Sequence, residues 1–293
     1  MTVAQWIGLA IQLSMATVIF CVALNAQFGN VAATLLRTPG LALRSLLAML
    51  VVMPVFAVVL AVTLDLKAPV ELALVASALS PVPPILPGRQ IKAGGQSTYV
   101  IGLLMISAVV AIFYVPLAAA LLGQVFHRPV EVDIGKVVSI VVTSMLLPVI
   151  AGMLVGKVAP ALAARLDKPL SALAMAVLVI ACVPILIKEW PAFTALVGHF
   201  SLVVMIVFTL VGLAVGHLLG GPDPDQRSVL ALATAARHPA VALAIVHNAV
   251  DQPGVMAAVL LLLLVGSAVS TPYMKWRLRL HEAAVAQRSA HAP

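Results

Sequence analysis

Long apolar runs recur along the whole chain and limit it to folds that a bilayer accepts. A spanning helix needs about 20 apolar residues, and we count nine such runs, separated by short polar connectors. Only 9% of the residues are charged, whereas soluble domains have about 25%. We therefore predict an all-α polytopic membrane protein with one transmembrane domain over residues 1–293. The predicted spans are Ile7–Ala26, Leu41–Leu64, Val70–Pro87, Thr98–Leu122, Ile134–Val155, Leu170–Ile187, Phe200–Leu219, Ser228–Val250 and Val255–Met274.

Positive charges are distributed unevenly over the connectors. Alternate connectors beginning after the first span hold twelve Lys and Arg residues, and the opposite set holds four. By the positive-inside rule, this predicts an outside N-terminus and a cytoplasmic C-terminus in the cell (inner) membrane, with residues 275–293 as a short basic cytoplasmic tail. The net charge of +7 is spread over short segments. We therefore expect the lipid bilayer as a partner, and no nucleic acid.

Four prolines interrupt the third span, at Pro81, Pro83, Pro84 and Pro87. Each lacks a backbone N–H and clashes with the preceding turn, so no regular helix can pass through them. We predict a broken helix, with a second half-helix beginning at Gly88. Such breaks occur at membrane depth only where they are buried in protein or line a cavity.

The run Arg237-His238-Pro239 interrupts the eighth span. Arginine near the bilayer centre costs roughly 2.5–3.5 kcal/mol on insertion scales, so it is expected to face protein, water or a ligand. Pro81 lies eleven residues after the outer start of its span and Arg237 eleven after the inner start of its own, so both lie roughly 16 Å deep. This predicts an inverted repeat of residues 41–122 and 200–274 with two crossing broken helices, which is typical of secondary transporters.

Several short motifs make the chain similar to the bile acid:sodium symporter superfamily. They are Met53-Pro54, Ser80-Pro81, Lys92-Ala93-Gly94-Gly95, Pro116, Leu147-Pro148 and residues 235–244. The resemblance implies a core domain and a panel domain that enclose a site where the broken helices cross. Nine spans resemble the family's nine-helix version.

The positions that bind sodium in that family carry other residues here. The family's Ser-Asn pair falls on Leu86-Pro87, and its two hydroxyl residues fall on Val100 and Leu104. Its carboxylate falls on Ala233, and its two glutamines fall on Met49 and Arg237. Sodium is a hard cation that needs several oxygens, and a guanidinium repels it. We expect a divergent member without a sodium site of the family's type, with no other metal and no cofactor.

The candidate substrate or coupling residues surround the two breaks. They are Thr234, Arg237, His238, Pro239, Ser80, Pro81, Pro83, Pro84, Pro87 and Ser107. Arg237 either presents its charge to an organic anion or serves the structure alone, and His238 is a candidate proton carrier. Arg89, Gln90 and Lys92 form either a solvated positive-inside cluster or an anion-attracting cytoplasmic vestibule.

These observations predict a sodium-independent secondary transporter of a small organic solute, anionic or amphipathic, with Arg237 in place of the sodium site and proton coupling as an option. Two alternatives remain open. One is a membrane sensor or partner-binding domain with a transporter fold, and the other is a sodium-coupled symporter that uses different ligands. No enzyme is expected, because the sequence contains no paired aspartates, no His-Glu-x-x-His motif and no serine dyad.

Overall fold

The computed structural model describes residues 2–26, 29, 37–125, 133–198, 200–246 and 254–290. Its described segments contain helices and no strand, and eight helices among them are long and apolar enough to cross a membrane. The remaining predicted span, residues 70–87, is broken. These findings confirm the prediction of an all-α polytopic membrane protein. The helices are α1 (Val3–Ala23), α3 (Pro39–Leu47), α4 (Met53–Thr63), α5 (Ala68–Leu79), α6 (Leu86–Lys92), α7 (Ser97–Val125), α8 (Ile134–Val141), α9 (Leu147–Val158), α10 (Pro160–Leu196), α11 (Ser201–Leu219), α12 (Pro224–Ala235), α13 (Pro239–Val246) and α14 (Val255–Ala290).

Two helices contain a π-helical turn directly before a proline. The turn η1 (Ala48–Val52) joins α3 to α4, and η2 (Val142–Leu146) joins α8 to α9. In each, the residue before the proline donates its N–H five residues back, from Met53 to Ala48 and from Leu147 to Val142. Prolines 54 and 148 then offer no N–H, so each turn leaves backbone acceptors for other partners.

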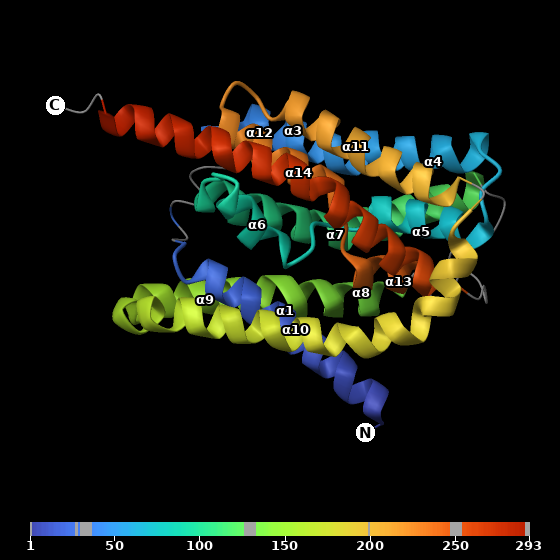
Figure 1. Cartoon of the computed structure of the whole chain (residues 1–293), viewed down its shortest axis with the longest axis horizontal. Helices are drawn as coiled ribbons and strands as arrows, with labels where there is room; N and C mark the ends of the chain where they lie inside the picture. The colour runs from blue at the N-terminus through green and yellow to red at the C-terminus, as the bar shows by residue number, and fades with distance from the viewer. Residues whose placement is uncertain are drawn as a thin grey trace.

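The helices form two layers, which Figure 1 shows one above the other. The panel layer consists of α1, α8, η2, α9 and α10, and the core layer contains the other helices. Within the panel layer, Gly152 and Gly156 of α9 face the backbone of α1. A Cβ added at either glycine would overlap the carbonyl of Phe20 or Leu24. Small residues four apart therefore bring these two helices into close contact.

A similar seam fixes α12 in the core layer. Gly212 and Gly216 of α11 and Gly220, which directly follows α11, recur every fourth residue and face the backbone of α12. A Cβ at Gly216 would lie 2.5 Å from the Cα of Ala231, and one at Gly212 would lie 2.9 Å from that of Ala235. Since α12 ends at Ala235, this seam places the start of the second break beside Gly212 of α11.

The two broken helices run in opposite directions, so that α13 packs beside α5 and α12 beside α6 (Figure 1). The local causes are visible in the backbone. Ser80 precedes Pro81 and is extended, because a following proline disfavours the helical conformation. Ala236 is also extended, with φ −98° and ψ 143°, and the chain regains helical structure at Pro239.

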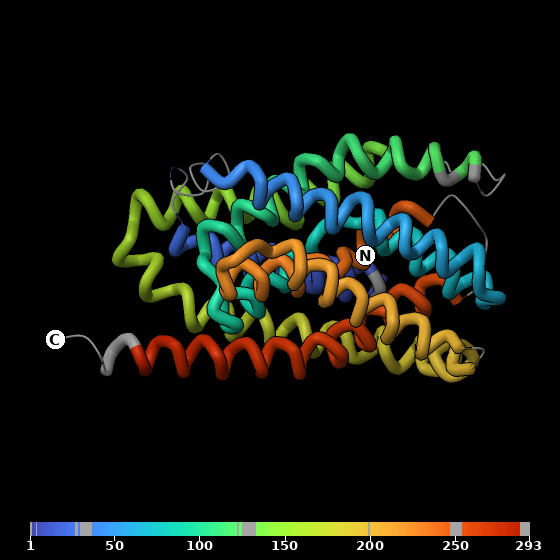
Figure 2. Tube along the Cα trace, turned by 90° about the horizontal axis from the view of Figure 1, so that it is seen from above, coloured from blue at the N-terminus to red at the C-terminus, as the bar shows by residue number. Residues whose placement is uncertain are grey.

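Two helices are longer than the predicted spans. Helix α10 covers 37 residues instead of residues 170–187 and contains three internal prolines. At about 55 Å, it exceeds the hydrocarbon thickness of a bilayer. Residues 275–290, expected to form a basic tail, continue α14, which runs along the whole length of the molecule in Figure 2. There the buried Arg277 donates to the Ser228 hydroxyl and the Pro224 carbonyl, both at 2.7 Å, and so ties α14 to α12.

Candidate functional site

The two breaks are hydrogen-bonded to each other. The backbone N–H of His238 donates to the Pro81 carbonyl at 3.0 Å and to the Ser80 hydroxyl oxygen at 2.9 Å. The Ser80 hydroxyl in turn donates to the Ser77 carbonyl at 2.8 Å, which orients its oxygen toward His238. The predicted crossing of two broken helices is therefore present.

The Arg237 guanidinium lies at this crossing with 7% of its residue surface exposed. Its Nη2 donates to the Thr234 carbonyl at 3.0 Å, and its Nη1 contacts the carbonyls of Met49 at 3.4 Å and Ser80 at 3.5 Å. The three oxygens come from η1 and from the ends of α5 and α12. Since the carbonyl end of a helix carries partial negative charge, two half-helices direct that charge at one cation.

The Met49 carbonyl is available because of Pro54. In the π-helical turn, the Met53 N–H donates to Ala48, and proline has no N–H for the Met49 carbonyl. The neighbouring Leu50 carbonyl loses its helical donor for the same reason, and the Tyr114 hydroxyl donates to it at 2.5 Å. The motif Met53-Pro54 thus leaves the Met49 carbonyl free to accept from Arg237. The sequence shows Pro54, but it does not indicate which side chain donates to the carbonyl that this proline leaves free.

The charge of Arg237 has no carboxylate counterpart in the described part of the chain. The ion pair found there joins His281 to Asp225 at 3.2 Å, on α14 and α12. The Nε of Arg237 is buried and lacks a hydrogen-bond partner among these residues. A buried cation held only by neutral carbonyls has an incomplete set of interactions.

His238 points toward the opposite layer. Its imidazole is 1% exposed, and Nε2 lies 3.3 Å from the hydroxyl of Ser144 on η2, in the panel layer. The Ser144 hydroxyl itself donates to the Ile140 carbonyl at 2.6 Å, so it accepts from a protonated Nε2. Nδ1 is then the unprotonated nitrogen, and it is buried without a partner among the described residues. Ser144 was not predicted as a site residue.

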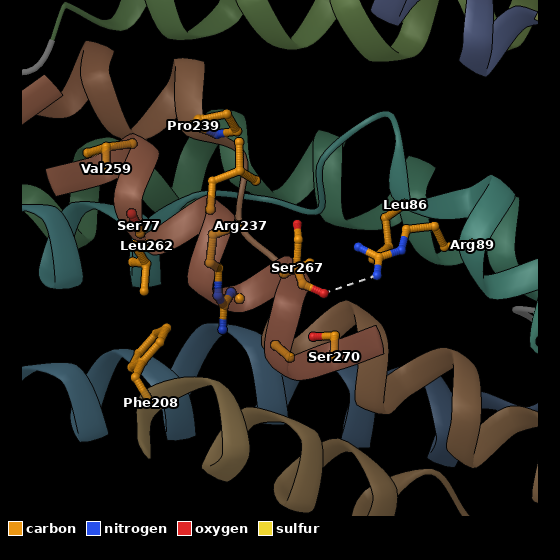
Figure 3. Close-up of a pocket in the computed structure, with 14 residues that line it drawn as sticks. Ser77, Leu86, Arg89, Phe208, Arg237, Pro239, Val259, Leu262, Ser267 and Ser270 are labelled. Carbon is orange, nitrogen blue, oxygen red and sulfur yellow. Dashed lines mark hydrogen bonds between the residues drawn. The ribbon is translucent and has the colours of Figure 1, made fainter. Parts of the chain in front are cut away.

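A cavity of about 40 Å³ adjoins the crossing inside the core layer. By this measure it has room for about three water molecules. Figure 3 shows the side chains of Arg237 and Arg89 at this cavity, with Ser267 between them. The described lining residues include no Asp or Glu, and they come from α5, α6, α11, α14 and the second break. The polar lining is therefore cationic and hydroxylic.

Apolar residues close the rest of this cavity. They are Leu86, Phe208, Ala235, Ala236, Pro239, Val259, Leu262 and Leu263. Of the predicted residues, Arg237, Pro239 and Arg89 thus line it. Phe208, Ser77, Ser267 and Ser270 also line it, and sequence reasoning missed them because their spans show no local irregularity there.

The other predicted residues lie elsewhere. Pro81, Pro83, Pro84 and Pro87 are buried in the first break and at the start of α6. The hydroxyls of Thr234 and Ser107 donate within their own helices, to Leu230 at 2.8 Å and Leu104 at 2.9 Å. These residues shape the breaks and their supporting helices without lining the cavity.

Arg89, Gln90 and Lys92, which were expected to form one cluster near the cytoplasmic side, lie in three different surroundings. Gln90 is buried and donates to the Val229 carbonyl at 2.7 Å, which joins α6 to α12, and Lys92 is exposed. Arg89 reaches the cavity, where its Nη2 donates to the Ser267 carbonyl at 3.3 Å and the Thr271 hydroxyl at 3.1 Å. No group of three or more His, Cys, Asp and Glu residues that could hold a metal occurs among the described residues.

Comparison with known proteins places the chain in a family. Residues 12–196, which run from within α1 to the end of α10, match the Sodium Bile acid symporter family. The matched stretch contains the first break, and Arg237 lies beyond it. A search of curated proteins found no match. Since the family match covers more than half of the sequence and the crossing of two broken helices is present, the chain belongs to the sodium bile acid symporter family.

Proposed function

We propose that this protein is a sodium-independent secondary transporter of a small organic solute, anionic or amphipathic, in which Arg237 takes the place of the coupling ion. The observation that carries this proposal is the donation of one guanidinium to three main-chain carbonyls at the helix crossing. Carbonyl oxygens are ligands that hard cations use. Here a covalently attached cation already uses them, and it cannot dissociate during a transport cycle.

The residue positions support the same reading. The resemblance to the family aligns Met49 and Arg237 with glutamines and Ala233 with a carboxylate. Arg237, which aligns with one of these glutamines, thus contacts the backbone carbonyl of Met49, which aligns with the other. The negative charge of the family's carboxylate is absent at Ala233. A sodium ion 4 Å from the guanidinium would be repelled by about 4 kcal/mol at an effective dielectric constant of 20.

The charge at the crossing supports an anionic solute as part of this proposal. Two guanidiniums, those of Arg237 and Arg89, line a cavity without acidic residues among its described lining. A cavity of about 40 Å³ is too small for an organic solute, and we propose that the solute binds where the core and panel layers face each other. An elevator-like or rocking motion of one layer against the other then exposes this boundary alternately.

Proton coupling is a second element of the proposal, and one observation favours it. His238 lies at the layer boundary, bonded to Ser144 through Nε2, and its Nδ1 has no partner in the described segments. Protonation of Nδ1 would add a buried donor without an acceptor and so favour separation of the layers there. This couples protonation to the motion that transport requires.

We also propose an outside N-terminus and a cytoplasmic C-terminus in the inner membrane, from the distribution of positive charges. A reporter enzyme that works only in the cytoplasm, fused after Pro293, tests this orientation. The expected result is activity in whole cells. Activity only from a reporter specific for the outer side would reverse the assignment.

The experiment that tests the function begins with a thermal-shift screen of organic anions on the purified protein, since a ligand of the folded state raises its stability. Uptake of the stabilising anion into proteoliposomes is then measured under a sodium gradient and under a choline gradient. Equal uptake supports the proposal, whereas uptake that rises with the sodium gradient contradicts it. Binding without uptake under any gradient would favour the sensor alternative.

A further inference from the structure

The core-layer cavity has a chemistry and a size that set it apart from a solute site. Two cationic side chains, Arg237 and Arg89, line about 40 Å³ of space, and none of the described lining residues is acidic. An organic solute does not fit this space, but a single ion slightly larger than a water molecule does. The sign of the lining charge excludes a cation.

The unused donors of the cavity point to the same kind of ligand. The hydroxyls of Ser77, Ser267 and Ser270 line it, and they take part in no hydrogen bond between described residues. The Arg237 Nε is buried and also lacks a partner there. The unpartnered Arg237 Nε is a buried donor, and leaving such a donor without an acceptor is costly. These groups come from α5, α14 and the second break, so one acceptor among them would join three segments.

The two guanidiniums are held in place by other contacts. Arg237 is fixed by carbonyls of Thr234, Met49 and Ser80, and Arg89 by the Ser267 carbonyl and Thr271 hydroxyl. Neither has a carboxylate partner in the described segments. The positive charge of the cavity is therefore built in and remains uncompensated by the residues around it.

We propose that this cavity binds a small monovalent inorganic anion, with chloride as the simplest occupant, between Arg237 and Arg89. The anion accepts hydrogen bonds from the serine hydroxyls and compensates one of the two positive charges. Because all lining residues belong to the core layer, the anion moves with that layer. The proposal does not depend on which solute is transported, and it holds also for a protein that senses and does not transport.

A thermal-shift titration of the full-length protein in detergent tests the proposal. Chloride replaces gluconate at constant ionic strength, and the expected result is a saturable rise in the melting temperature. Arg89→Gln should weaken the apparent affinity for chloride by roughly tenfold to a hundredfold, because one charge-assisted contact is lost. Arg279→Gln, which changes an exposed arginine on α14, should leave the affinity unchanged.

Two results of this titration would overturn the proposal. One is an identical melting temperature of the wild-type protein in chloride and gluconate. The other is a chloride response that Arg89→Gln and Arg279→Gln alter equally, since the anion would then bind at general surface charge. Because Arg89 is only half-buried, its variant is expected to fold, and the test does not require substitution of Arg237.

A crystal of the protein grown in bromide provides a readout that is independent of stability. Bromide replaces chloride and gives an anomalous signal that locates it. The proposal expects a peak between the guanidiniums of Arg237 and Arg89, within reach of the hydroxyl of Ser267. Bromide peaks found only on the protein surface would show an adventitious ion only and would exclude the site.

Discussion

The backbone N–H of His238 donates to the carbonyl of Pro81 at 3.0 Å, and this bond joins the two breaks of the chain across 157 positions of sequence. On one side of this bond, Arg237 reaches into the core layer toward Met49. On the other side, the His238 imidazole reaches Ser144 of the panel layer. Two neighbouring side chains thus make two kinds of contact, one within a layer and one between layers.

Arg237→Met should destabilise the protein and abolish transport. The variant leaves the carbonyls of Thr234, Met49 and Ser80 without their donor, and an unsatisfied buried polar group costs about 1–3 kcal/mol. The free energy of unfolding is measured by denaturation in detergent, with Arg279→Met as the control at an exposed position. Equal stability of the two variants would show that the three carbonyl contacts are energetically unimportant.

His238→Gln should flatten the dependence of uptake on pH. A glutamine amide can still donate to Ser144 but does not titrate, whereas histidine changes its charge between about pH 5 and 8. Initial uptake rates of wild type and variant are compared over that range. A wild-type pH profile that persists in the variant removes His238 from proton coupling and leaves it as a contact between the layers.

Gly216→Ala should destabilise the packing of α11 against α12. The new Cβ would lie 2.5 Å from the Cα of Ala231, and overpacking typically costs about 1–3 kcal/mol. The matched control is Gly8→Ala, because a Cβ there meets nothing within 4 Å, and alanine favours a helix by up to about 1 kcal/mol. The account is contradicted if both variants melt at or above the wild-type temperature.

The double variant Ala233→Glu with Arg237→Gln should respond to sodium, because loss of the guanidinium frees the carbonyls of Thr234, Met49 and Ser80 to bind the ion beside the new carboxylate. It restores the carboxylate and the glutamine that the family resemblance places at these positions, and it removes the guanidinium that repels the ion. Thermal stability is compared in sodium chloride and choline chloride, with Ala233→Glu alone as the control. A double variant that folds but melts identically in both salts would argue that Arg237 does not occupy the position of the ion.

The breaks of the two crossing helices were predictable from the sequence because their causes are local. Proline removes a helical N–H wherever it occurs, and an arginine in an apolar span must find partners. Pro81 and Arg237 therefore gave the positions of the two breaks along the chain correctly. The helical character of the spans followed from hydrophobicity in the same way.

The partners of the crossing residues were not predictable, because they depend on tertiary packing. The Met49 carbonyl becomes an acceptor through the π-helical turn before Pro54, and Ser144 meets His238 through the contact between the layers. The length of α10 was underestimated for a related reason. The predicted span, residues 170–187, lies between Pro169 and Pro191, but the helix continues through both.

Arg237 is proposed to replace the sodium ion, and a sodium titration of the wild-type protein is the sharpest test of this role. Sodium chloride is exchanged for choline chloride at constant ionic strength and constant chloride, and the melting temperature is recorded. We expect an unchanged melting temperature, since the carbonyls at the crossing already bind a guanidinium. A saturable rise that is specific for sodium would contradict it.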